Sequence, residues 1–274
     1  MQFLIESRRD RPADDPIFSL HTEAKSRQAA GEDVVDATIG ALLHDDGTLA
    51  TLPTMVEAIA SVPPAVHAAY APISGRADLR QAVVEDLLAG TSQHPRATSV
   101  ITPGGSGALR MAFDDFLEPG QAVLTGSFYW GPYRTLADES GRSLKTFSLF
   151  DAAHRYDAAA LDQAVGETLA EQGRCLLVLN TPCHNPPGYS LDEKEMEQTA
   201  AILSRHADTG PVTLLLDIAY GYYARDSLEM LVQAVEELSD KIMVLYAWSA
   251  SKSFAQYGSR VGALVGVAPR AEDR

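Results

Sequence analysis

The sequence predicts an α/β protein in which a mainly parallel β-sheet is covered by α-helices. Seven short apolar segments alternate with longer segments whose apolar residues recur every three or four positions. This alternation is typical of parallel strands that are linked by helices. Of the 274 residues, 46% are hydrophobic and 22% are charged, which is enough apolar material for a large buried core. We therefore expect one sizeable α/β domain with at most a small appendage.

All the predicted strands lie in the later part of the chain. They cover residues 97–105, 122–130, 143–150, 175–180, 212–220, 242–249 and 262–269. Helices are expected at 54–62, 77–90, 106–117, 191–207 and 227–241. In the helix at 106–117, one face carries the apolar residues Leu109, Ala112, Phe113, Phe116 and Leu117. The first part of the chain differs because prolines interrupt it, and no linker marks a sharp domain boundary.

Composition and charge exclude several classes of function. The formal net charge of −15 argues against binding to nucleic acids or to an anionic membrane surface, because both favour basic patches. The start has too short an apolar run for a signal peptide, and no stretch of about eighteen apolar residues follows, so a cytoplasmic protein is expected. Cys175 and Cys183 cannot form a disulfide framework, and no Cys/His spacing indicates zinc. His44, Asp45 and Asp46 are typical of a solvated loop, so no metal site is predicted.

A glycine-rich turn follows the first predicted strand. Gly104, Gly105, Ser106 and Gly107 stand between that strand and the start of a helix. Free backbone N–H groups and the positive end of the helix dipole favour a phosphate group at such a position. The spacing matches neither a dinucleotide-binding motif nor a P-loop, so a plain turn between strand and helix is an equally good interpretation.

Two other predicted strands lead into polar residues, as expected for a site at the carboxyl edge of an α/β sheet. Asp217 ends an apolar run and Tyr220 follows it. A buried carboxylate is costly unless it meets a positive charge or donors, so Asp217 either caps the next turn or binds a protonated ring nitrogen. Asn185 lies in a proline-rich turn whose rigid backbone can aim its amide; the alternative is an ordinary proline turn.

The segment WSASKSFAQYGSRVG, at residues 248–262, holds Lys252 and Arg260. Lys252 is either a solvated surface residue or a buried amine whose lowered pKa makes it a nucleophile. Arg260 is suited to bind a phosphate, together with the hydroxyl groups of Ser249 and Ser251. An amine that forms a Schiff base, a phosphate site and an aspartate for a pyridinium nitrogen together predict pyridoxal 5'-phosphate (PLP).

This segment resembles the lysine motif of the fold-type-I PLP enzymes, specifically the class I aminotransferases of the aspartate and aromatic group. The resemblance extends from about residue 35 to residue 268. It implies the large domain of that fold, with a seven-stranded, mostly parallel sheet, helices on both faces and an additional N-terminal segment. It also implies transfer of an amino group between an L-amino acid (aspartate, aromatic or similar) and a 2-oxo acid.

The resemblance implies a role for each of these residues. Lys252 forms the Schiff base and moves the proton of the substrate α-carbon, while Asp217 keeps the pyridine nitrogen protonated. Asn185 and Tyr220 hydrogen-bond to the ring hydroxyl oxygen. Trp130 stacks on the ring; the alternative is a core tryptophan. The residues implied to bind the phosphate are Gly105, Ser106, Ser249 and Arg260, with Ser251 in support.

Two N-terminal segments also resemble the family. In YAPISG, at residues 70–75, the resemblance implies that Tyr70 reaches the cofactor phosphate of a neighbouring subunit, and therefore a homodimer with shared sites. In DATIGALLHDDG, at residues 36–47, it implies that Gly40 lines the substrate pocket. Each segment is also compatible with a plain turn.

The chain departs from the family after its last predicted strand. Members usually continue into a small domain that supplies the arginine for the substrate carboxylate, and neither Arg270 nor Arg274 has a matching context. We therefore expect an N-terminal segment at 1–60, belonging to the small domain and substrate entrance, a PLP-binding large domain at 61–274, and no C-terminal small domain. A fragment of a transaminase is favoured over half of a split gene or a degenerate protein.

The same cofactor supports more than one reaction, because the protein selects which bond breaks. The alternative functions are therefore a PLP-dependent lyase or decarboxylase of the same fold, or a catalytically incomplete PLP-binding module.

Overall fold

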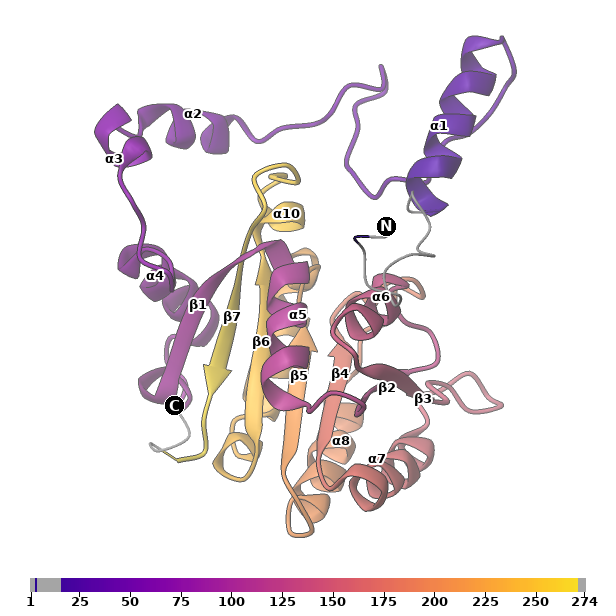
Figure 1. The fold of residues 1–274 in the computed structure, drawn as a ribbon, viewed down its shortest axis with the longest axis vertical. Coiled ribbons are helices and arrows are strands. Elements are labelled where there is room, and N and C mark those ends of the chain that lie inside the picture. Colours follow the sequence, from indigo (N-terminus) through magenta and orange to yellow (C-terminus); the bar gives the residue numbers. More distant parts are fainter. Residues whose placement is uncertain (1–2, 4–15, 271–274) are drawn as a thin grey trace. The chain divides into compact units, whose positions relative to one another are not determined.

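The structure, a computed structural model, describes residue 3 and residues 16–270, which fall into two compact units divided between Ala50 and Thr51. The first unit holds helix α1 (Pro16–Ala29) and a long loop, in which Leu43 and Leu49 form an isolated antiparallel bridge (Figure 1). The second unit holds the sheet and the other described helices. The domain boundaries expected above stay predictions, and Arg274 lies outside the described residues.

The second unit is built on a seven-stranded sheet with the order β1-β7-β6-β5-β4-β2-β3 (Figure 1). The strands are β1 (Ala97–Pro103), β2 (Ala122–Gly126), β3 (Ser143–Phe147), β4 (Cys175–Asn180), β5 (Val212–Asp217), β6 (Met243–Ser249) and β7 (Val261–Val267). Hydrogen-bonded neighbours are parallel except for β7, which runs antiparallel to both β1 and β6. Each strand falls where an apolar segment predicts one, so the expected mostly parallel sheet is confirmed.

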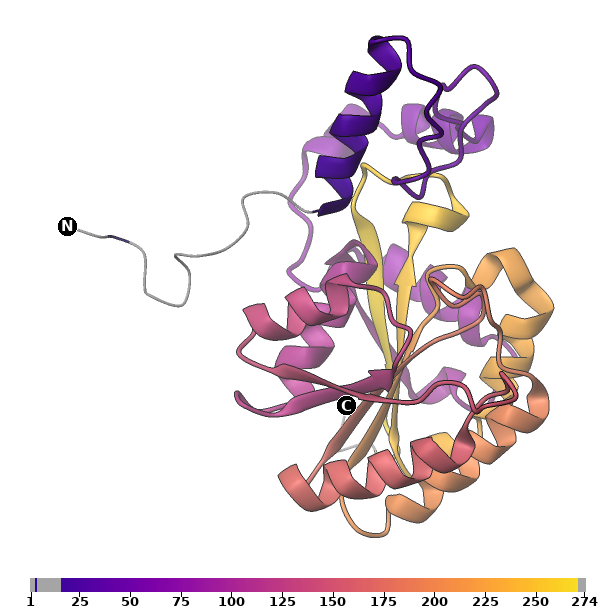
Figure 2. The ribbon, with the colours of Figure 1, turned by 90° about the vertical axis from the view of Figure 1, so that its right-hand side faces the viewer.

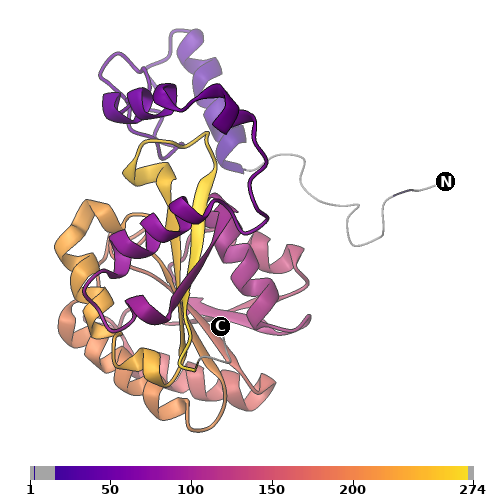
Figure 3. The same ribbon diagram turned by 90° about the vertical axis from the view of Figure 1, so that its left-hand side faces the viewer.

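The central strands are buried on both faces, which explains why their sequences are continuous apolar runs. In β4, Leu177 and Leu179 belong to one hydrophobic core, and Leu176 and Val178 belong to another. Successive side chains of a strand point to opposite faces, so the two cores lie on the two sides of the sheet. Helices cover both sides, as Figures 2 and 3 show.

The helices around the sheet are α4 (Ala77–Leu88), α5 (Gly104–Phe116), α6 (Pro132–Glu139), α7 (Ala158–Gln172), α8 (Glu193–His206) and α9 (Arg225–Ala234). The shorter ones are α2 (Pro53–Ser61), α3 (Pro64–Ala68) and α10 (Ala250–Ser253). The expected helices correspond to α2, α4, α5, α8 and α9. In the described part of the chain, no helix is both long and apolar enough to span a membrane.

Helix α7 was not expected, although its ends carry ordinary start and stop signals. Asp157 Oδ1 accepts a hydrogen bond from the Ala160 N–H at 2.9 Å, which caps the first turn. Gly173 ends the helix in the left-handed conformation, with a φ of 75°. Caps therefore identify this helix better than its apolar pattern does.

The topology brings several chain segments to one edge of the sheet. Because β4, β5 and β6 are parallel, their carboxyl ends meet there, with Asn180 paired to Asp217 and Asp217 paired to Ala247. Strand β7 starts at the same edge, where Gly262 pairs with Ser249. Helix α5 begins there too, directly after β1. This edge is where an open α/β sheet binds its ligand.

Candidate active site

The turn between β1 and α5 lies against the turn before β7. A Cβ atom on Gly104 would lie 2.5 Å from Arg260 Nη2, and one on Gly262 would lie 2.3 Å from the carbonyl carbon of Gly104. Gly104 also has a φ of +75°, in the left-handed region that favours glycine. Glycine at both positions therefore allows the Arg260 guanidinium to approach the N-terminus of α5.

The N-terminus of α5 is built to receive an anion. Its N-cap residue, Pro103, makes no side-chain cap hydrogen bond, and Gly105 and Ser106 belong to the first turn. Gly105 lies close to β6, because a Cβ atom there would be 3.3 Å from Ser249 Cβ. The N–H groups of a first helical turn have no partner within the helix, and the helix dipole makes this end positive.

Arg260 adds a full positive charge to this position. Its Nη1 donates hydrogen bonds to Ser251 Oγ at 3.3 Å and to the Tyr257 carbonyl at 3.0 Å. Ser249 Oγ accepts a hydrogen bond from the Ser251 N–H at 3.2 Å and so caps α10. We call Arg260, Ser249, Ser251 and the first turn of α5 the anion cradle. A guanidinium, hydroxyl groups and helix N–H groups in one place are the chemistry that binds a phosphate.

Lys252 lies on α10, next to the anion cradle, and is half-buried. Its Nζ is 5.6 Å from the ring centre of Tyr220 and 5.1 Å from that of Tyr257. Burial lowers the pKa of Lys252, and the charge of Arg260 lowers it further. The amine is therefore neutral more often than an exposed lysine is at the same pH, and a neutral amine is a nucleophile.

Tyr220 follows the end of β5 and lies beside both Lys252 and the Asn185 side chain. Burial, more than the charge of Asp217, raises the pKa of Tyr220, while a hydrogen bond from the Asn185 side chain lowers it. The Asn185 backbone N–H donates to Asn180 Oδ1 at 2.7 Å, which fixes the turn after β4. The two side chains thus present an amide and a phenol side by side, both able to donate to one oxygen atom.

Asp217, at the end of β5, has only 5% of its surface exposed. It accepts hydrogen bonds from the Tyr133 hydroxyl at 2.6 Å and from the Ala219 N–H at 3.2 Å. Burial raises the pKa of Asp217, and these two hydrogen bonds oppose that shift. Within the described residues no Lys, Arg or His nitrogen forms an ion pair with it. A buried carboxylate of this kind favours a cationic ligand.

Trp130 is half-buried and contacts Tyr133 edge to face, with ring centres 5.8 Å apart and an interplanar angle of 87°. Its neighbour Phe128 has 51% of its surface exposed and contacts Phe150 instead, on the far side of the turn. The aromatic residue connected to Asp217, through Tyr133, is therefore Trp130.

Comparison with protein families relates this geometry to known proteins. The family model of aminotransferase class I and II matches residues 32–273. This chain belongs to that family. Members generally use pyridoxal phosphate as cofactor. The resemblance of the lysine segment to class I aminotransferases is thereby confirmed.

Individual relatives agree with the family. The chain is 30% identical to a tyrosine aminotransferase of Klebsiella pneumoniae over 93% of its length, and 29% identical to an aspartate aminotransferase of Pseudomonas aeruginosa over 91%. It spans 64% and 62% of the lengths of these two relatives. A crystal structure of an aminotransferase from Anaerococcus prevotii is 30% identical, with a TM-score of 0.89 over 100% of this chain and 68% of that one. These matches confirm the fold-type-I large domain.

In this aminotransferase-family chain, two residues of the site were missed by the sequence analysis. Asn180 ends β4, and its Nδ2 donates to the Asp217 carbonyl at 2.8 Å. Tyr133 lies in α6 and is fully buried, with 0% exposed. A polar residue at the end of a buried strand is a signal that could have identified Asn180. Nothing in the local sequence indicates that Tyr133 reaches Asp217, because the contact joins residues 84 positions apart.

The roles of all the residues predicted for the aminotransferase site stay predictions, those of Tyr70 and Gly40 included. Tyr70 lies between α3 and α4 with a fully exposed side chain, so it is not buried in a site of its own chain. Gly40 lies in the first unit, on the loop that follows α1. The structure brings together the other predicted residues at the carboxyl edge of the sheet.

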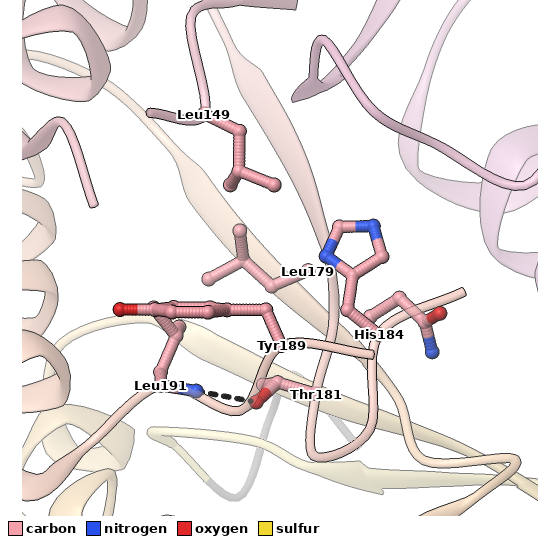
Figure 4. A pocket seen from close by; sticks show the side chains of 7 residues that line it. Leu149, Leu179, Thr181, His184, Tyr189 and Leu191 are labelled. Carbon is pink, nitrogen blue, oxygen red and sulfur yellow. Dashed lines mark hydrogen bonds between the residues drawn. The ribbon is translucent and has the colours of Figure 1, made fainter. Parts of the chain in front are cut away.

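A small cavity lies beside the end of β4 and the residues that follow it (Figure 4). It is lined by Leu149, Leu179, Asn180, Thr181, His184, Tyr189 and Leu191. Burial lowers the pKa of His184 to about 4, although a hydrogen bond with the Phe128 backbone opposes this shift. The imidazole is therefore neutral near pH 7. An apolar cavity with one neutral imidazole supports the turn after β4 but lacks the charges of the anion cradle.

Proposed function

We propose that this chain binds PLP through Lys252 and takes part in amino-group transfer between an L-amino acid and a 2-oxo acid. The observation that carries the proposal is the position of Lys252, a half-buried amine of lowered pKa beside the anion cradle. A lysine nucleophile next to a phosphate site is what an aldehyde cofactor with a phosphate requires. Family membership supports transamination over the lyase and decarboxylase alternatives.

The residues present fit each polar group of the proposed cofactor. The anion cradle suits the phosphate, and the absence of a Cβ atom at Gly104 and Gly105 lets Arg260 and Ser249 lie close to the first turn of α5. Asp217 suits a protonated ring nitrogen, since it is buried and has no cationic partner among the described residues. Asn185 and Tyr220 suit the ring oxygen. A second charge at contact distance from Asp217 would stabilise it by about 4 kcal/mol at an effective dielectric constant near 20.

When bound, PLP supplies an aldehyde that condenses with amines and a ring that withdraws electrons from the substrate α-carbon. The chain supplies the rest of the chemistry. Lys252 Nζ would hold the aldehyde carbon and, once free of it, would accept the proton of the substrate α-carbon as a general base. Its lowered pKa supports both roles, because the neutral amine is the reactive form. Asp217 keeps the ring nitrogen protonated.

The relatives are an aspartate and a tyrosine aminotransferase, so we propose acidic or aromatic amino acids as the substrate class. Incubation of the PLP-loaded chain with aspartate or tyrosine should release the matching 2-oxo acid in single turnover. Lys252→Ala should abolish this release while leaving the fold intact by circular dichroism. Release of ammonia with pyruvate instead would contradict transamination and favour a lyase. Release of carbon dioxide would favour a decarboxylase, and no reaction at all of a folded, PLP-loaded chain would favour the cofactor-binding module.

We further propose that two copies of the chain share their sites. Tyr70 and Ile73 are each fully exposed, and α2 buries none of its residues, with Val56 50% and Ile59 43% exposed. Apolar side chains exposed together favour burial against another protein surface. The molar mass in solution, measured by sedimentation, should be that of a dimer. A monomer at high concentration would contradict this part of the proposal.

A further inference from the structure

Among the described residues, the Tyr133 hydroxyl has one hydrogen-bond partner, Asp217. The ring lies in the first turn of α6 and is completely buried, and its hydroxyl donates to Asp217 Oδ2 at 2.6 Å. A distance this short is typical of a hydroxyl that donates to an ionised carboxylate. Burying a phenol without a partner would cost free energy, so the contact fixes both groups.

The hydrogen-bond donors around Asp217 are few. Besides Tyr133, only the Ala219 N–H donates to its carboxylate among the described residues, at the longer distance of 3.2 Å. Asn180 donates to the backbone carbonyl of Asp217 and not to its carboxylate. Tyr133 is therefore the main side-chain group that opposes the effect of burial on this carboxylate.

Tyr133 also joins Asp217 to Trp130, the residue that the resemblance implies to stack on the cofactor ring. Its ring contacts Trp130 edge to face, and its hydroxyl binds Asp217. Gly131 and Pro132 separate Trp130 from Tyr133, and Pro132 starts α6. The start of this helix thus sets the position of the Trp130 ring relative to the end of β5.

We propose that Tyr133 is a positioning residue of the cofactor site, which holds the Asp217 carboxylate in one orientation and in its ionised form for the ring nitrogen of PLP. This inference rests on the proposed function. It assigns to α6 a role in the affinity for the cofactor, although the Tyr133 hydroxyl is fully buried behind Asp217.

The protonation states are consistent with this role. Burial, and next the charge of Asp217, raise the pKa of Tyr133 well above its ordinary value, so its hydroxyl keeps its proton and stays a donor. Tyr220 also senses the charge of Asp217, and its pKa is raised, mainly by burial. Both phenols are neutral near pH 7, so Asp217 is the group that titrates in this cluster as the pH falls.

The test compares two variants that each remove one buried hydroxyl. Tyr133→Phe removes the donor to Asp217. Tyr246→Phe is the matched control, because Tyr246 is also fully buried and its hydroxyl donates to Gln93 Oε1 at 2.8 Å. The dissociation constant of PLP is measured between pH 5 and pH 9 by quenching of tryptophan fluorescence, for both variants and the unaltered chain.

We expect Tyr133→Phe to raise the PLP dissociation constant roughly tenfold near neutral pH, as loss of a hydrogen bond to a charged group does. Removing this donor raises the pKa of Asp217, so the weakening of binding at low pH should begin at a higher pH. Tyr246→Phe should leave the pH profile unchanged. Equal changes in both variants, with the same pH midpoint, would overturn the inference and assign Tyr133 a purely structural role.

Two further measurements separate this inference from the proposed function. Infrared titration of the Asp217 carboxyl in the PLP-free chain, assigned with Asp217→Asn, should show a higher midpoint in Tyr133→Phe; an unmoved midpoint would overturn the inference without reference to PLP. In the Asp217→Asn background, Tyr133→Phe should have little further effect on PLP affinity. If the folded, unaltered chain binds no PLP, the proposed function fails and the cofactor role of Tyr133 fails with it.

Discussion

The two ends of the candidate site are held in different ways. At the phosphate end, the anion cradle and Lys252 come from two short stretches, 104–106 and 249–260, that meet where Gly262 touches Gly104. At the ring-nitrogen end, Asp217 depends on Tyr133, which is 84 positions away along the chain. Contacts between the backbones of two turns therefore set the first end, and contacts between buried side chains set the second.

This difference has a physical consequence for substitutions. The phosphate end should be sensitive to a Cβ atom added at Gly262, because backbone there touches backbone. The ring-nitrogen end should instead be sensitive to the loss of single hydrogen-bonding atoms, since its groups are buried and have few partners.

The largest expected effect is on stability, at Gly262. Gly262→Ala would place a Cβ atom 2.3 Å from the Gly104 carbonyl carbon, so backbone would have to move. We expect the free energy of unfolding to fall by about 3 kcal/mol, as for overpacking in a core. Gly258→Ala in the same turn is the control, because its Cβ atom would meet nothing within 4 Å. Equal urea midpoints for the two variants would contradict a tight contact.

Asn180→Ala tests the ring-nitrogen end of the site and should have the next largest effect on stability. It leaves the Asn185 N–H without its 2.7 Å partner and should cost about 2 kcal/mol of stability. The control is Gln172→Ala, because Gln172 bridges backbone groups elsewhere in the sheet, accepting from the Ala122 N–H at 2.8 Å. Both variants should unfold at lower urea concentration, but only Asn180→Ala should also weaken PLP binding. Equal PLP affinity in the two variants would show that Asn180 does not contribute to the cofactor site.

Arg260→Lys keeps the charge at the phosphate end but loses the planar guanidinium. We expect the PLP dissociation constant to rise roughly tenfold, since a point charge does not replace bidentate hydrogen bonds. Arg225→Lys, on α9, should leave PLP binding unchanged. The affinity for inorganic phosphate, measured by its competition with PLP, should fall in parallel. Unchanged phosphate competition in Arg260→Lys would show that the anion cradle is not the phosphate site.

The smallest expected effect concerns the pKa of Lys252. The charge of Arg260 contributes to lowering it, so Arg260→Gln should raise it and reduce the neutral fraction of the amine at a given pH. Formation of the visible adduct with pyridoxal, which lacks the phosphate, should therefore need a higher pH in Arg260→Gln. A midpoint that stays in place or moves to lower pH would mean that burial alone controls Lys252.

The sequence allowed the sheet and the phosphate end to be predicted for the same reason: both are encoded locally. Apolar runs mark buried strands, and Lys252 and Arg260 lie within one short motif. Asp217 was predictable as a charged residue at the end of such a run. Tyr133 was not, because a tertiary contact chooses it from ten tyrosines in the chain. The left-handed conformation of Arg260, with a φ of 50°, likewise arises from packing between turns.

The central claim is that Lys252 holds PLP, and mapping of the attachment site tests it most directly. The chain is incubated with PLP, reduced with borohydride, digested and analysed by mass spectrometry. We predict a single labelled lysine, Lys252, and loss of the label in Lys252→Ala. A folded chain that takes up no label, or that carries it on exposed lysines such as Lys241 to the same extent, would contradict the account.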